Sequence, residues 1–257
     1  MDNQVATPNT QEDSKFKFPT EEVELPSKGL LYPEDSALSS GKVEIKYMTA
    51  KEEDILTNQN YISKGIVIDK LLQSLIMSPI NYDELLIGDK NAIMLAARIL
   101  GYGSDYSFTY NGEEQTADLT EYEAKFFDES LFVKGKNEFE FTLPHSKNNI
   151  TFKLLTHGDE KKIEREIDGL KKINKNTSFD LSTRLKHIVT SVNGSYESKD
   201  VRDFVGNYML AKDSRALREY MKEISPDIDL KTTISTIDGT DVIDLPITVN
   251  FFWPDAG

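Results

Sequence analysis

Residues 23–33 read Val-Glu-Leu-Pro-Ser-Lys-Gly-Leu-Leu-Tyr-Pro, and this stretch decides how the N-terminal part of the chain is built. Pro19, Pro26 and Pro33 fix the backbone φ angle and remove amide donors, so a helix is excluded and we expect an extended arm. Gly29 allows a turn with positive φ. The apolar side chains of the arm must pack either on their own domain or on a neighbouring subunit.

Beyond the arm, the apolar spacing first predicts a strand and then helices. Residues 43–48 alternate as a strand, and the capping box at 49–52 (Thr-Ala-Lys-Glu) begins a short helix. A second helix is expected over residues 68–76. A third follows Asp89 as its N-cap and stops at Gly101.

Two β-ribbons and a helical block are expected next. In the first ribbon Tyr106, Phe108 and Tyr110 alternate before a hairpin turn at Asn111-Gly112. The second ribbon pairs residues 138–143 with residues 150–154. Four helical stripes follow, and their ranges are 163–173, 181–192, 201–208 and 217–224.

A hairpin about Asp238-Gly239 closes the chain, and its last strand should carry one apolar face from Ile243 to Trp253. Strands that are grouped apart from helices indicate an α+β fold: an extended N-terminal arm, helices with antiparallel β-ribbons, and a C-terminal helical block closed by a β-hairpin. We divide the chain into three parts: 1–15, expected to be disordered, 16–120, the arm with an N-terminal α+β domain, and 121–257, a C-terminal α+β domain.

Composition restricts the function. The 44 acidic and 30 basic residues give a net charge of −14, which argues against nucleic acid as the main partner. We see neither a signal peptide in the first fifteen residues nor an apolar run long enough to insert in a membrane. The absence of cysteine excludes disulfides and thiolate chemistry.

The sequence contains no motif that indicates a catalytic, cofactor or metal site. Phosphate-binding fingerprints are missing, and Gly101-Tyr102-Gly103 follows a helix, whereas phosphate binds at a helix N-terminus. His157-Gly158-Asp159-Glu160 comes closest to a metal cluster, but we interpret it as the start of a helix. We therefore expect a protein that is not an enzyme.

The aromatic end, Phe251-Phe252-Trp253-Pro254, is a different kind of signal. Phe251 and Trp253 follow the apolar face and should fill the core, whereas Phe252 lies on the opposite face, where it is either simply exposed or contacts a partner. The candidate protein-binding residues are therefore Leu25, Pro26, Lys28, Leu30, Leu31, Tyr32 and Phe252.

Five segments in this order resemble a family of baseplate hub and hub-assembly proteins of T4-like phages: residues 24–33, 47–56, 68–72, 85–91 and 98–106. The similarity spans residues 18–115, and the remainder looks like longer members of that family. The resemblance implies a hub subunit or a hub-assembly chaperone that binds other baseplate proteins. Such a protein would act in the host cytoplasm during assembly. The resemblance leaves open whether it stays in the tail baseplate of the virion and which oligomeric state it has.

Two alternatives stay open: a phage regulator that binds a host protein, and an enzyme with a dispersed active site. If the arm docks on a partner, deletion of residues 1–33 should leave a folded core and abolish partner binding.

Overall fold

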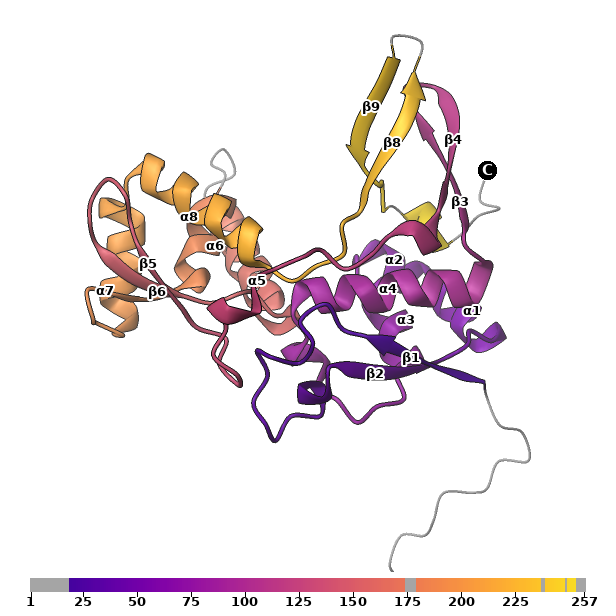
Figure 1. Ribbon diagram of the computed structural model, residues 1–257, viewed down its shortest axis with the longest axis horizontal. Coiled ribbons are helices and arrows are strands. Elements are labelled where there is room, and N and C mark those ends of the chain that lie inside the picture. The colour runs from indigo at the N-terminus through magenta and orange to yellow at the C-terminus, as the bar shows by residue number, and fades with distance from the viewer. Residues whose placement is uncertain (1–18, 174–178, 237–238, 248, 253–257) are drawn as a thin grey trace, which may run out of the picture.

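The computed structural model describes residues 19–173, 179–236, 239–247 and 249–252, and these form an α+β protein of two lobes (Figure 1). The first lobe comprises residues 19–121 and 230–252, and the second lobe comprises residues 137–224. Between them run the crossing segment, residues 122–136, and the return segment, residues 225–229. The predicted α+β class is confirmed. Residues 1–15, predicted to be disordered, and Trp253, predicted to fill the core, lie outside the described residues.

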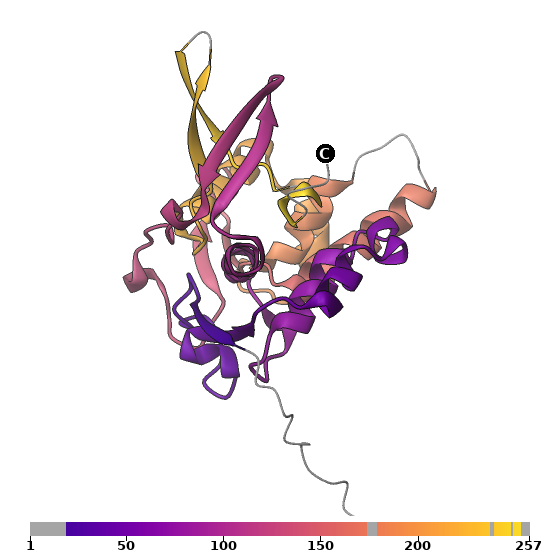
Figure 2. The same ribbon diagram turned by 90° about the vertical axis from the view of Figure 1, so that its right-hand side faces the viewer.

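Helices and paired ribbons build the first lobe. Its elements are the antiparallel pair β1 (Thr20–Glu24) and β2 (Lys42–Lys46), the helices α1 (Ala50–Leu56), α2 (Gln59–Ser63), α3 (Val67–Leu75) and α4 (Ile87–Tyr102), the ribbon β3 (Asp105–Tyr110) and β4 (Glu113–Asp118), and the ribbon β8 (Lys231–Thr236) and β9 (Gly239–Asp244). The two ribbons rise side by side from the same side of α4 in both views (Figures 1 and 2).

The predicted apolar patterns account for these elements. Val43 and Ile45 alternate into the core from β2, and Leu71, Leu72 and Leu75 bury one face of α3 completely. The turn between β3 and β4 has positive φ at both central residues, Asn111 and Gly112, as the hairpin signal predicts.

A three-stranded sheet and four helices build the second lobe. Its elements are β5 (Phe139–Thr142), β6 (Asn149–Phe152) and β7 (Val189–Val192) in the antiparallel order β5-β6-β7, with α5 (His157–Ile173), α6 (Asp180–Ile188), α7 (Ser198–Asp203) and α8 (Ala211–Ile224). A π-helical turn, Phe204–Tyr208, follows α7. An aromatic chain runs through the core, with the rings of Phe139 and Phe152 stacked at 5.4 Å.

Three predicted boundaries are wrong for local reasons. Asp89 lies inside the first turn of α4, which extends one residue past Gly101 to Tyr102 and ends before Gly103, a glycine with positive φ. Residues 189–192 form strand β7, because the β-branched Val189 and Val192 pair with the edge of β6 instead of continuing α6. The last strand ends at Asp244.

The C-terminal end differs most from the predicted strand over residues 243–253. Leu245 still donates its N–H to the carbonyl of Leu230 at 2.7 Å, but the next residue is Pro246, which has no N–H to donate. Residues 249–252 then form a 3-10 helix that returns to α4. The described residues between 230 and 252 therefore pack with the first lobe, although they belong to the predicted C-terminal part, 121–257.

Candidate functional site

The arm folds back onto its own lobe. Of the candidate binding residues in the arm, Leu25, Pro26, Leu31 and Tyr32 are buried, Leu30 is half-buried and Lys28 is exposed. The turn that permits this has positive φ at Lys28 (52°) and Gly29 (76°). Of the two alternatives for the arm, packing on its own domain is the one that the structure shows.

Deletion of residues 1–33 is consequently no longer expected to leave a folded core. It would remove β1, which pairs with β2 along its whole length, together with the buried side chains of Leu25, Leu31 and Tyr32. Partner binding by the arm is therefore tested by single substitutions in the arm.

A buried hydrogen-bond network, here called the arm clasp, fixes the arm to α4. The carboxylate of Asp89, fully buried, accepts bonds from the backbone N–H of Ser27 (2.9 Å), the hydroxyl of Ser27 (2.6 Å) and the hydroxyl of Tyr32 (2.6 Å). The Tyr32 oxygen in turn accepts from the N–H of Leu86 at 2.9 Å. Burial raises the pKa of Asp89, and these donors oppose that shift.

The stretch that carries Asp89 also contacts the second lobe and the return segment. The N–H of His157 donates to the carbonyl of Leu85 at 2.7 Å, and the side-chain amide of Asn91 donates to Asp227 at 3.0 Å. Gly88 lies so close to the carbonyl of Pro226 that a β-carbon there would overlap it. Residues 85–91, one of the segments that carries the family resemblance, therefore join the arm, α4 and both lobes.

The exposed tip of the arm lies against the crossing segment. The Lys28 ammonium forms an ion pair with Glu129 and lies 5.8 Å from the ring centre of Phe127. The carbonyl of Leu30 accepts from the N–H of Gly135 at 2.8 Å. The crossing segment thus covers the arm and presents its own outer face beside it.

That outer face carries three exposed apolar side chains among charged ones. Phe127 and Phe132 turn inward, with ring centres 4.9 Å apart, whereas Phe126, Leu131 and Val133 remain 89%, 44% and 62% exposed. We call the set Lys28, Leu30, Phe126, Leu131 and Val133 the arm–crossing surface. Sequence reasoning missed its three large side chains because residues 122–136 form only one short 3-10 turn, Glu129–Leu131, so no periodicity marks which of them face solvent.

Phe252 is not part of any exposed surface. It is fully buried, and its ring centre lies 5.2 Å from that of Phe251, which packs edge-on to Tyr106 at 5.0 Å. The prediction that Phe251 fills the core is confirmed, and the placement of Phe252 on an outer face is wrong because the 3-10 helix turns both rings inward.

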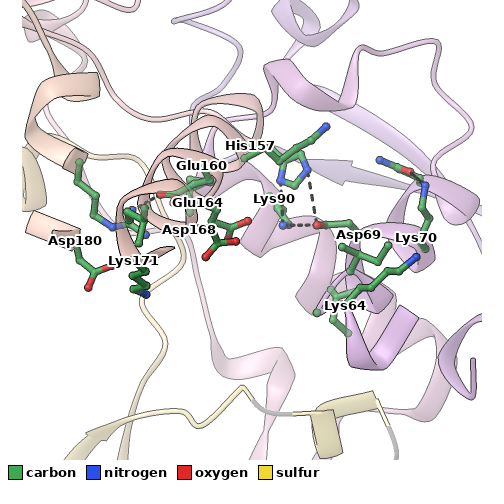
Figure 3. A pocket seen from close by; sticks show the side chains of 18 residues that line it. Lys64, Asp69, Lys70, Lys90, His157, Glu160, Glu164, Asp168, Lys171 and Asp180 are labelled. Carbon is green, nitrogen blue, oxygen red and sulfur yellow. Dashed lines mark hydrogen bonds and ion pairs between the residues drawn. The ribbon is translucent and has the colours of Figure 1, made fainter. Parts of the chain in front are cut away.

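A cleft runs between the lobes. It has a volume of about 800 Å³ and lies between α3 and α5, with side chains from both lobes facing it (Figure 3). At one end the Asp69 carboxylate accepts from Lys90 (2.5 Å) and from the hydroxyl of Tyr82 (3.0 Å), while the ring of His157 packs edge-on to Tyr82.

Asp69, Lys90, Tyr82 and His157 form a quartet with an acid, a base and adjacent space, which are also features of a catalytic site. Burial raises the pKa of Tyr82 far above its ordinary range and lowers the pKa of His157. The nearest His157 nitrogen lies 3.8 Å from Asp69 and 3.9 Å from Asp83, beyond hydrogen-bond length. Asp69 and Lys90 neutralise each other, so the quartet mainly ties α3, α4 and α5 together.

The lowered pKa of His157 gives a testable pH dependence. Because the unfolded chain binds a proton on this ring more readily than the folded chain does, the free energy of unfolding should fall as the pH drops below about 6.5. Urea unfolding at pH 7.5 and pH 5.5 should show a larger loss for the wild type than for His157→Phe, which keeps an aromatic ring at this position but cannot titrate. Equal losses in the two proteins would contradict this interpretation.

Comparisons with known proteins return nothing: no protein-family model, no curated protein and no solved structure matches the chain. Among the described residues, no three His, Asp or Glu side chains come together in a way that could hold a metal ion. No described helix combines the length and the apolar character needed to cross a lipid bilayer.

Proposed function

We propose that this chain is a non-enzymatic protein-binding component of a phage tail, a baseplate hub subunit or a hub-assembly chaperone. It would capture other baseplate proteins, in the host cytoplasm, through the arm–crossing surface. The observation that carries this proposal is the exposure of Phe126, Leu131 and Val133 beside Lys28 and Leu30. Exposed apolar side chains with an aromatic among them are typical of protein interaction sites.

The family resemblance supports the same proposal in a second way. Its segments 24–33 and 85–91 meet in the arm clasp, and segment 98–106 contains Arg98, whose guanidinium donates to the carbonyls of Gly103 (2.6 Å) and Asp105 (2.9 Å). These segments therefore act mainly as the framework that holds the arm tip under the crossing segment. On this proposal the framework is shared with the family and the surface above it selects the partner.

Replacing Phe126, Leu131 and Val133 together by aspartate should abolish capture of baseplate proteins from phage-infected cells without unfolding the chain. All three side chains are exposed, so each change is expected to alter stability by less than about 0.5 kcal/mol. The matched control replaces Tyr208, Leu210 and Val242, three exposed apolar residues away from this surface, by aspartate. Unchanged capture by the first variant, with a normal urea midpoint, would refute the proposal.

The quartet beside the cleft is the observation that favours the enzyme alternative. General acid–base catalysis requires a group that can exchange a proton with a substrate near neutral pH. The Asp69 carboxylate is instead engaged by Tyr82 and Lys90, and His157 is buried against Tyr82. Under our proposal Asp69→Asn changes stability but leaves capture of baseplate proteins unchanged.

A further inference from the structure

The cleft between the lobes has the construction of a helix-binding groove. α3 and the turn before it form one wall, and α5 forms the other (Figure 3). Its lining includes four isoleucines from three separate stretches of the chain: Ile66, Ile68, Ile87 and Ile167. Ile167 is nearly fully buried, and the other three are half-buried, so the chain itself leaves part of this apolar floor uncovered.

The two walls carry opposite charges above that floor. Lys64 and Lys70 lie on the first-lobe wall, and both are exposed. Glu164 and Asp168 lie one helical turn apart on α5, and their carboxylates point from α5 toward the opposite wall (Figure 3). None of these four side chains forms a salt bridge with a described residue.

The remaining charges that line the cleft are largely paired within the protein. Lys90 pairs with Asp69, and Arg184 pairs with Glu160 at 2.6 Å. Lys161 pairs with Asp83 at 2.9 Å. The charges left for an occupant are therefore mainly two cations on one side and two carboxylates on the other, with Lys171 one turn beyond Asp168 at the end of the acidic wall.

From this arrangement we infer that the cleft binds an amphipathic α-helix of a partner protein, with an apolar stripe on the isoleucine floor, an acidic flank facing Lys64 and Lys70, and a basic flank facing Glu164 and Asp168. The two flanks of an amphipathic α-helix lie on either side of its apolar stripe, so such a helix can place that stripe on the floor and one charged flank against each wall. A small ligand that contacted one wall would leave the opposite charges unmatched. The inference rests on the proposed function only in taking the partner to be a polypeptide.

Synthetic peptides test this directly on the full chain. The probe is a fluorescent helical peptide of about 18 residues, five turns, with leucines on one stripe, glutamates on one flank and lysines on the other. Two controls keep the leucines but carry lysines, or glutamates, on both flanks. A fourth peptide keeps the mixed flanks and replaces the leucines by serine. Fluorescence anisotropy at low salt measures each dissociation constant.

We expect the mixed-flank peptide to bind about three- to tenfold more tightly than either control with like-charged flanks, because two exposed ion pairs are worth roughly that much. The serine peptide should not bind. The double variant Glu164→Lys, Asp168→Lys makes both walls basic and should shift the preference to the peptide with glutamates on both flanks. The control variant Glu113→Lys, Glu114→Lys makes the same charge change on β4, away from the cleft, and should keep the wild-type order.

Equal binding of all leucine peptides, binding by the serine peptide, or no binding at all would each overturn the inference. Because these assays use synthetic peptides and no baseplate partner, their failure is distinct from a failure of the arm–crossing surface to capture baseplate proteins. Normal thermal unfolding of the two double variants shows that any changed preference arises in the cleft.

Discussion

Asp89→Ala is expected to lower the free energy of unfolding by about 2–5 kcal/mol. The substitution leaves the buried N–H of Ser27 and the buried hydroxyl of Tyr32 without their acceptor, and each unsatisfied buried donor costs about 1–3 kcal/mol. The same change frees the arm from α4, so we also expect faster proteolysis within residues 25–33. Urea unfolding and limited proteolysis measure the two effects.

A matched control separates this effect from a general loss of charge. Asp54 is exposed on α1 and its side chain makes no hydrogen bond with a described residue, so Asp54→Ala should stay within about 0.5 kcal/mol of the wild type. If Asp89→Ala were as stable as Asp54→Ala, the arm clasp would not be what holds the arm.

Phe252→Ala is expected to lower the free energy of unfolding by about 3–5 kcal/mol, the usual cost of removing a buried phenylalanine ring. The cavity would lie beside Phe251, and it would loosen the contact of Phe251 with Tyr106 and with the Arg98 guanidinium 6.0 Å away. Thermal or urea unfolding measures the loss.

Phe252→Ala also distinguishes a core role from a binding role. At a temperature where the variant is still folded, its capture of baseplate proteins should equal that of the wild type. Val242→Ala, an exposed apolar residue of the neighbouring strand β9, serves as the control for both readouts. A stable variant that loses capture would restore Phe252 as a contact residue.

The sequence predicts most elements of the fold, because their apolar spacing is local. The strand at residues 43–48, the helix at 68–76 and the hairpin at Asn111-Gly112 all depend on patterns within a few residues. The Glu52 carboxylate of the predicted capping box accepts from the N–H of Thr49 at 3.0 Å and also from Lys46 at 2.8 Å. No local pattern predicts that second partner. Glu52 is fully buried, which by itself raises its pKa, but its hydrogen bonds with Lys46, Thr49 and Ser74 lower the pKa to about 2.

The rest depends on contacts between distant residues. The apolar alternation from Ile243 to Trp253 predicts one long strand, because the local pattern contains no sign that residues 249–252 turn back to contact α4. Asp89 reads as an N-cap because its actual donors, Ser27 and Tyr32, lie 62 and 57 residues away. The exposure of Phe126 follows from how an irregular segment crosses between two lobes, which hydrophobic periodicity does not encode.

On our proposal the arm–crossing surface binds other baseplate proteins, and chemical cross-linking in infected cells tests this binding most directly. Lys28 and Lys134 are exposed amines within and beside this surface, so an amine-reactive cross-linker followed by mass spectrometry reports what lies against it. We predict cross-links from both lysines to baseplate proteins, lost in the triple aspartate variant. Cross-links from these lysines only to host proteins, or to baseplate proteins only from lysines far from this surface, would contradict the account.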